Sequence, residues 1–114
     1  MSDCIFCKIV AGDIPADIVH EDDKVLVFKD INPRTQVHLL TIPKQHIESL
    51  AEIDDSHDQL MAHMIKLQQT LAKKQGLESG FRTIINTGKG GGQEVFHLHI
   101  HLLGGNNLPA FTKE

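Results

Sequence analysis

Tryptophan and tyrosine are absent from the 114-residue chain, and five phenylalanines are its only large aromatic residues. Packing must therefore depend mainly on aliphatic side chains. There is also no excess of positive charge, because 15 acidic residues outnumber 11 basic ones and give a net charge of −4. This balance argues against a protein that coats nucleic acid. No apolar run approaches the length of about 18 residues that a membrane span needs, so no membrane partner is expected.

Cysteine is scarce as well, with only Cys4 and Cys7 in the chain. The sequence shows no N-terminal signal pattern and no lipidation motif, so the expected location is the cytoplasm. Reducing conditions there disfavour a disulfide between the two cysteines. The length suits one domain spanning residues 1–114, large enough to bury a real core.

Histidine, by contrast, is abundant, and three of the eight alternate with aliphatic residues in His97-Leu98-His99-Ile100-His101. A two-residue period predicts a β-strand that presents all three imidazoles on one face. At a rise of about 3.3 Å per residue the outer two lie about 13 Å apart, so one metal ion cannot bind all three. The three histidines are therefore expected to have different functions. The alternative is a row of solvated histidines on an exposed edge strand.

The remaining patterns predict an α+β fold, with a mainly antiparallel five-stranded sheet and two main helices. Strands are expected at 17–20, 25–29, 37–42, 82–87 and 95–103, the first two joined as a hairpin. Helices are expected at 4–10, ended by Gly12, and at 56–75, where apolar residues recur at helical spacing. A further short helix is expected at 46–53.

Cys4 and Cys7 have the spacing of a zinc-binding pair, but a tetrahedral structural site needs four ligands. His46, which follows a predicted strand, and His97, the first of the triad, are the favoured partners. This choice leaves His99 and His101 available for other chemistry. Two ordinary buried cysteines on one helical turn would have the same spacing. The predicted cofactor is a structural zinc ion.

A glycine-rich segment from Gly88 to Gln93 directly precedes the histidine run. Glycine lets backbone N–H groups approach an anion closely, and Asn86 just before the segment can hydrogen-bond a ligand oxygen. The segment lacks the Gly-Lys-Ser/Thr ending of a Walker A loop. A flexible connection between strands is the alternative explanation.

Imidazole beside phosphate-binding amides predicts nucleophilic catalysis, since a neutral ring nitrogen can attack phosphorus and then be displaced by water. A neighbouring histidine would protonate the leaving group or orient phosphate oxygens. The alternative is a catalytic metal on His99 and His101, for which Glu94 is the only nearby carboxylate. No catalytic metal is therefore expected.

Asp30 follows the second predicted strand, where its carboxylate can accept hydrogen bonds from both hydroxyls of a ribose. The apolar residues available to sandwich a base are Phe6, Ile9, Ile14 and Phe28. Each feature also has a simpler explanation. An aspartate shortly before Asn32-Pro33 is an ordinary way to open a turn, and the apolar residues can belong to the core.

Together these residues resemble the histidine-triad nucleotide-binding family, whose signature His-φ-His-φ-His-φ-φ, with φ apolar, is met by residues 97–103. The resemblance covers nearly the whole chain and includes Asp30-Ile31, the 37–47 segment and the 86–93 loop. The Gly104-Gly105 ending is similar to the Hint branch, whereas the Fhit branch has Pro-Arg there.

The resemblance implies a homodimer in which two five-stranded sheets form one ten-stranded sheet, and hydrolysis of purine nucleoside 5′-phosphoramidates. It implies that His99 is the nucleophile that forms a nucleotidyl-histidine intermediate, assisted by His101 and His38. Zinc-bearing members have ligands at the positions of Cys4, Cys7, His46 and His97. The matching nucleotide-binding positions are Phe6, Ile9, Ile14, Phe28, Asp30, Ile31, Asn86, Gly92, Gln93 and Val95.

Two departures from the family pattern concern the leaving group. Some Hint enzymes have a serine at the position of Glu94 and a tryptophan in the C-terminal tail, whereas the tail here contains Phe111 as its only aromatic residue. Two alternative functions follow from the same residues. One is a nucleotide-binding adaptor with vestigial catalysis, and the other is a dinucleoside polyphosphate hydrolase, which the Gly104-Gly105 ending disfavours.

Overall fold

The computed structural model describes residues 3–105 and 108–109, so the tail with Phe111 lies outside the described residues. The main elements are α1 (Ile5–Ala11), β1 (Ile18–Glu21), β2 (Val25–Lys29), β3 (Val37–Pro43), α2 (Asp58–Lys74), β4 (Arg82–Ile84) and β5 (Ile100–Gly104). The short 3-10 turns of the described part are η1 (Leu50–Glu52), η2 (Asp55–His57) and η3 (Lys89–Gly91). No helix among these is long and apolar enough to cross a membrane.

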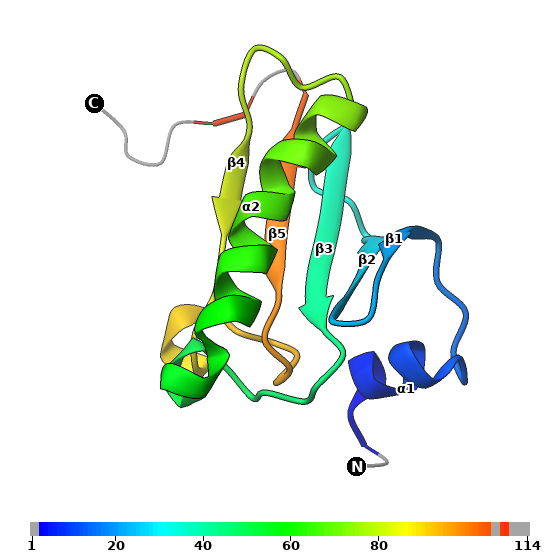
Figure 1. The fold of residues 1–114 in the computed structure, drawn as a ribbon. Coiled ribbons are helices and arrows are strands. Elements are labelled where there is room, and N and C mark those ends of the chain that lie inside the picture. Colours follow the sequence, from blue (N-terminus) through cyan, green and yellow to red (C-terminus); the bar gives the residue numbers. More distant parts are fainter. Residues whose placement is uncertain (1–2, 106–107, 110–114) are drawn as a thin grey trace.

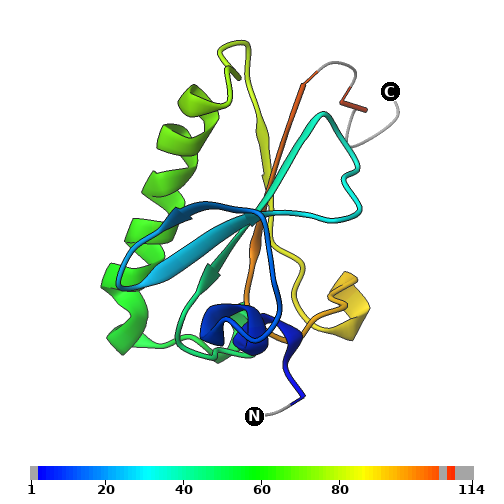
Figure 2. The same ribbon diagram turned by 90° about the vertical axis from the view of Figure 1, so that its right-hand side faces the viewer.

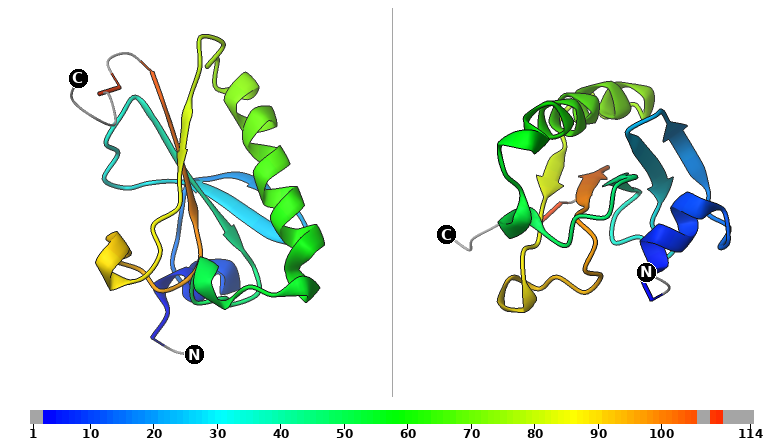
Figure 3. Two further views of the ribbon diagram at one scale, coloured as in Figure 1. Left: turned by 90° about the vertical axis from the view of Figure 1, so that its left-hand side faces the viewer. Right: turned by 60° about the horizontal axis from the view of Figure 1, so that its bottom comes forward.

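The strands form one antiparallel sheet in the order β1-β2-β3-β5-β4, which confirms the predicted α+β architecture. Helix α2 lies along one face of this sheet (Figure 1). The glycine-rich loop and the loop before β3 project on the other side, as the turned view shows (Figure 2). The short helix α1 lies at the same end of the sheet as the glycine-rich loop but toward the opposite edge, away from α2 (Figure 1 and Figure 3).

Alternate residues of each central strand serve the two faces, because successive side chains on a strand point in opposite directions. Val25 and Val27 of β2 belong to the core that packs against α2. Leu26 and Phe28, between and after them, belong to a second core with Phe6 of α1. The sheet therefore has an aliphatic face under α2 and a second face that carries the polar residues of the cleft described below.

Helix α1 is short, and both of its ends have clear local causes. Cys4 is the N-cap residue, and its Sγ accepts a hydrogen bond from the backbone N–H of Cys7. The helix ends at Gly12, whose φ of 84° is a left-handed conformation that glycine adopts without strain. The ring of Phe6 is buried and meets Phe28 edge-on, with the centroids 5.5 Å apart.

The short helix predicted at 46–53 is wrong, because only the turn η1 forms in that stretch of the described chain. Two carbonyl groups that such a helix would use accept hydrogen bonds from elsewhere. The Ile47 carbonyl accepts from the Leu98 N–H at 2.7 Å, and the Glu48 carbonyl accepts from Gln93 Nε2 at 2.9 Å. These bonds hold the loop against the histidine segment.

The strand predicted at 95–103 begins only at Ile100, so the placement of His97 and His99 on a strand is wrong. The backbone before Ile100 has other partners, since Leu98 donates to the loop described above and the Val95 carbonyl accepts from Gln93 Nε2. Strand β4 is shorter than the predicted 82–87 as well. It ends at Ile84, which pairs with His101, and β5 extends only one residue further in that direction.

Candidate active site and metal centre

A cleft of about 640 Å³ opens on the face of the sheet opposite α2. Its lining comes from α1 and the residues after it, the end of β2 with the following loop, β3, β5, and the segment around the glycine-rich loop. The predicted catalytic and nucleotide-binding residues that line it are Phe6, Ile9, Ile14, Phe28, Asp30, Ile31, His38, Asn86, Gly92, Val95, His99 and His101. Residues far apart in the sequence are therefore brought together here.

Gln93 is placed differently from the other predicted nucleotide-binding residues, because it is buried and does not line the cleft. Its Oε1 accepts a hydrogen bond from the Gly88 N–H, and its Nε2 donates to the carbonyls of Glu48 and Val95. The side chain thus links the glycine-rich loop to the Glu48 carbonyl through hydrogen bonds.

The backbone amides of the glycine-rich loop are largely used within the loop. The N–H groups of Gly91 and Gln93 both donate to the Gly88 carbonyl, and that of Gly92 donates to the Lys89 carbonyl. Gly92 itself has a φ of 84°, and a Cβ there would lie 3.7 Å from Asn86 Nδ2. The loop thus closes on itself as η3, and the Asn86 side chain is held at the cleft by its bond to the Gly91 carbonyl.

The position of the proton on His99 follows from one backbone contact. Its Nδ1 lies 2.7 Å from the carbonyl oxygen of His97. A carbonyl only accepts, so the proton of the neutral ring lies on Nδ1 and the lone pair lies on Nε2. The ring is buried against Phe6, at a centroid distance of 5.2 Å. His99 therefore presents one defined, unprotonated nitrogen for chemistry.

His38 and His101 form a hydrogen-bonded pair, with His38 Nε2 2.9 Å from His101 Nδ1. The Arg34 backbone N–H donates to His38 Nδ1 at 3.1 Å, so the proton of the neutral His38 ring lies on Nε2. That proton is donated to His101 Nδ1, which leaves His101 with its own proton on Nε2. The His101 ring lies next to the His99 ring, at a centroid distance of 4.9 Å.

Burial lowers the pKa of His101 from 6.5 to about 4, and the neighbouring His99 and His38 act in the same direction. Arg34 lowers this pKa further, whereas the Asp30 carboxylate opposes the shift. Burial also lowers the pKa of His38. Both rings of the pair are therefore neutral at pH 7, as the proton positions above require.

The low pKa of His101 predicts a pH-dependent stability. Between about pH 4 and 6.5 the unfolded chain protonates this residue and the folded chain does not, so the free energy of unfolding falls as the pH falls through that window. His101→Gln should reduce the slope by at most about 1.4 kcal/mol per pH unit. Urea unfolding of the wild-type protein and of His101→Gln across this pH range, with the metal content verified at each pH, measures the slope. An unchanged slope in the variant would contradict the assignment.

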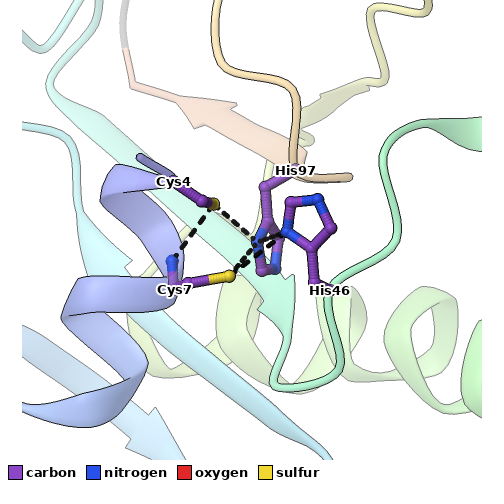
Figure 4. Close-up of side chains that lie close together, drawn as sticks. All are labelled: Cys4, Cys7, His46 and His97. Carbon is purple, nitrogen blue, oxygen red and sulfur yellow. Dashed lines mark hydrogen bonds between the residues drawn. The ribbon is translucent and has the colours of Figure 1, made fainter. Parts of the chain in front are cut away.

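Four metal-binding side chains converge beside α1 (Figure 4). His97 Nδ1 lies 3.2 Å from Cys4 Sγ, 3.6 Å from Cys7 Sγ and 3.2 Å from His46 Nδ1. Cys7 Sγ and His46 Nδ1 are 3.2 Å apart. We call these four residues, Cys4, Cys7, His46 and His97, the Cys/His cluster. All four donor atoms lie within 4.8 Å of one another.

The donor geometry of the Cys/His cluster fits a tetrahedral metal ion. Ligands at about 2.0–2.1 Å for nitrogen and 2.3 Å for sulfur are separated by roughly 3.3–3.8 Å from each other, close to the observed distances. His97 Nε2 donates to the Pro43 carbonyl at 2.8 Å, which directs the Nδ1 lone pair at the other three ligands. Burial and the adjacent Cys4 raise the pKa of the Cys7 thiol, which disfavours its ionised form. A bound cation would act in the opposite direction and favour the thiolate.

Two features were not singled out by the sequence analysis. One is Arg34, and the other is the contact of Asp22 with two histidines. Arg34 lines the cleft, and no spacing rule connects it with the histidines. Asp22 Oδ2 bridges His20 Nε2 at 2.9 Å and His63 Nε2 at 2.7 Å, which joins the β1–β2 turn to α2. His20 and Asp22 are neighbours in the sequence, but His63 lies 41 residues from Asp22 without a shared motif, so only the tertiary structure reveals the bridge.

Comparison with known proteins agrees with the fold. Residues 3–113 match the family model described as "Scavenger mRNA decapping enzyme C-term binding". Protein HitA of Neisseria gonorrhoeae is 56% identical over 104 residues, which cover 91% of this chain and 97% of that protein. A 14 kDa zinc-binding protein of Zea mays is 42% identical over 109 residues, covering 94% and 85% of the two chains.

Solved structures give the same result. A HIT family hydrolase from Legionella pneumophila Philadelphia 1 superposes with a TM-score of 0.91 at 45% identity, covering 94% of this chain and 96% of that one. A histidine triad protein from Clostridium difficile superposes with a TM-score of 0.93 at 46% identity, covering 98% of each chain. The agreement extends over almost the entire length, and the chain belongs to the histidine-triad (HIT) family.

Proposed function

We propose that this chain is a nucleotide-binding hydrolase that cleaves purine nucleoside 5′-phosphoramidates through a nucleotidyl-histidine intermediate. The observation that carries the proposal is the His99 ring, whose Nδ1 is held by the His97 carbonyl so that the unprotonated Nε2 is the nucleophile. The Legionella relative, which is named a hydrolase, supports a hydrolytic reaction.

The first chemical step forms a bond between His99 Nε2 and phosphorus while the bond from phosphorus to the leaving amine breaks. An amine leaves only after it gains a proton, and a neutral imidazole N–H is too weak an acid to supply it. The His38–His101 pair, next to the His99 ring, is therefore proposed to take up one proton from solvent when the anionic substrate binds and to pass it from His101 to the amine. His38 shares its own proton with His101 Nδ1, which stabilises the ring after this transfer.

The second step releases the nucleoside monophosphate. Water attacks phosphorus as the bond to His99 Nε2 breaks, and the proton lost by water returns to His101 Nε2. The pair of steps therefore consumes one water, restores both histidines and needs no metal-bound nucleophile.

The nucleoside half of the substrate is proposed to occupy the rest of the cleft. Asp30 Oδ1 accepts from the Asn32 N–H at 2.8 Å. The other oxygen, Oδ2, lies 3.4 Å from His38 Nε2 and is proposed as the acceptor for ribose hydroxyls. Asn86 would donate to the phosphate, with Gly92, Gln93 and Val95 shaping the loop around it. The residues proposed to hold the base are Phe6, Ile9, Ile14, Phe28 and Ile31.

The Cys/His cluster is proposed to hold a structural zinc ion. The name of the maize relative, a zinc-binding protein, supports this identity of the metal. Two thiolates and two imidazoles complete a tetrahedron, so no position is left open for a substrate or a reactive water. The ion would therefore hold α1 and the His97 segment in place and would take no part in the reaction.

A homodimer with a continuous ten-stranded sheet is proposed from the family resemblance. Strand β4 is at the edge of the sheet, so its outer side is available for pairing with a second copy. A particle mass of one chain in sedimentation equilibrium would contradict this part of the proposal.

Steady-state hydrolysis of an adenosine 5′-phosphoramidate, compared with a diadenosine polyphosphate at equal concentration, tests the substrate class. We expect kcat/KM for the phosphoramidate to be larger by about 100-fold or more, a difference of about 2.7 kcal/mol in transition-state stabilisation. The reverse preference would support the dinucleoside polyphosphate hydrolase instead. Binding of AMP without turnover of either compound would identify a nucleotide-binding adaptor.

A further inference from the structure

We propose that metal binding at the Cys/His cluster and nucleotide binding in the cleft are thermodynamically coupled through α1. The inference rests on the proposed function, since it takes the cleft to be a nucleotide site. It goes beyond that function because it makes metal content a determinant of nucleotide affinity.

The same short helix contributes to both sites. Cys4 and Cys7 bracket Phe6, so two metal ligands flank a residue that lines the cleft. Ile5 and Ile9 of α1 line the cleft as well. A helix of 7 residues is far below the length of about 12–15 residues at which isolated helices become even marginally stable, so its order depends on what it is attached to.

Helix α1 has few attachments to the rest of the molecule. Over the described residues 3–16, backbone hydrogen bonds outside the helix stay within this segment. The only polar contacts from the segment to other parts of the described chain are those of the two cysteine sulfurs with His46 and His97. Apolar packing against the second core is the other attachment, through the buried Phe6 and the partly buried Ile9 and Val10. Without the metal, only S–H···N hydrogen bonds between the cysteines and His46 and His97 would remain as polar attachment, and a thiol is a weak donor.

A second connection runs from the cluster to the proposed nucleophile. His97 contributes its ring to the cluster, and its carbonyl oxygen accepts the Nδ1 proton of His99. Phe6 contacts both rings edge-on, at centroid distances of 5.9 Å to His97 and 5.2 Å to His99. Phe6 is thus a positioning residue, and its own position depends on the metal ligands Cys4 and Cys7 on either side of it in the sequence.

The direction of the coupling follows from this arrangement. Nucleotide binding requires an ordered α1 as one wall of the cleft, and a metal-loaded cluster already supplies that order. The metal-loaded protein should therefore bind a nucleotide more tightly, and by linkage the nucleotide should raise metal affinity by the same factor. We expect a factor of about ten, within the usual range for coupled sites.

Calorimetric titration of AMP into the metal-loaded and the chelator-depleted full chain measures the coupling. We expect AMP to bind about tenfold more weakly after depletion. Hydrogen exchange should show faster exchange in α1 and retained protection in β2, β3 and α2, which distinguishes local release from unfolding. A reciprocal measurement uses only the loaded, folded protein. AMP should shift zinc extraction by a competing chelator by the same factor.

Two variants separate coupling from simple damage. Phe6→Leu keeps all four metal ligands and should reduce the effect of AMP on zinc extraction. The matched control is Phe81→Leu, which alters a phenylalanine that is 42% exposed and lies outside the cleft, and it should leave the effect unchanged.

Four results distinguish failure of the coupling from failure of the proposed function. Equal AMP affinity of loaded and depleted protein, or zinc extraction that AMP does not change, overturns the coupling. Failure of the loaded protein to bind AMP overturns both the coupling and the proposed nucleotide site. Binding of AMP with normal coupling but without hydrolysis overturns only the proposed reaction.

Discussion

His99→Ala is expected to lower the turnover of an adenosine 5′-phosphoramidate at least about 1,000-fold, equivalent to about 4 kcal/mol of transition-state stabilisation. The variant loses the only atom assigned to bond formation with phosphorus, whereas Asp30, Asn86 and the apolar wall of the cleft remain. AMP should therefore still bind. Initial rates and AMP titrations on both proteins measure the two effects separately.

The intermediate gives a second readout for the same variant. Wild-type protein mixed with saturating substrate and quenched with denaturant at alkaline pH, because the bond between histidine nitrogen and phosphorus is acid-labile, should carry a nucleotidyl adduct detectable by mass spectrometry. His99→Ala should carry none. His63→Ala is the matched control because His63 lies on α2 and does not line the cleft. Turnover of His99→Ala at the wild-type rate would exclude His99 as the nucleophile.

Loss of one ligand from the Cys/His cluster is expected to remove the metal and much of the stability that it contributes. Protein purified without added metal should contain about one zinc per chain, and Cys4→Ser or His46→Gln should contain far less. At free zinc 1,000 times the dissociation constant, binding adds about 4 kcal/mol to the free energy of unfolding. Metal analysis and denaturant unfolding measure both consequences.

A histidine outside the cluster controls for the substitution itself. His57 accepts from the Asp54 N–H in a capping box, and glutamine at the same position can form that box too. His57→Gln should therefore retain both zinc and stability. Full metal content in Cys4→Ser and in His46→Gln would exclude the proposed ligand set.

Much of the fold could be predicted because local signals agree with tertiary packing. The hairpin, β3 and the long helix all appear, and Gly12 ends the first helix as its position indicates. The Cys/His cluster could also be proposed, since the spacing of Cys4 and Cys7 leaves two ligands missing and histidines are available. In both cases the pattern and the structure depend on the same physical requirement.

The errors have a common cause, which is long-range hydrogen bonding that no local pattern contains. The periodicity around His97 and His99 is that of a strand, yet the Leu98 N–H and the His97 carbonyl bond to a loop and to a side chain. Likewise, the N–H groups of Gly91, Gly92 and Gln93 donate to carbonyls within the glycine-rich loop, which its composition alone does not indicate. The Gln93 side chain connects the glycine-rich loop, through the Gly88 N–H, with the Glu48 and Val95 carbonyls beside the histidine segment.

The two faces of the sheet also differ in how well they tolerate amino-acid substitutions. Residues such as Val25, Val27 and Leu39 are almost completely buried under α2, so most substitutions there reduce stability. Exposed positions at the rim of the cleft, among them Arg34 and Glu94, bear no such constraint. Duplicated copies of this gene could therefore acquire new leaving-group preferences at the rim while inheriting an unaltered scaffold.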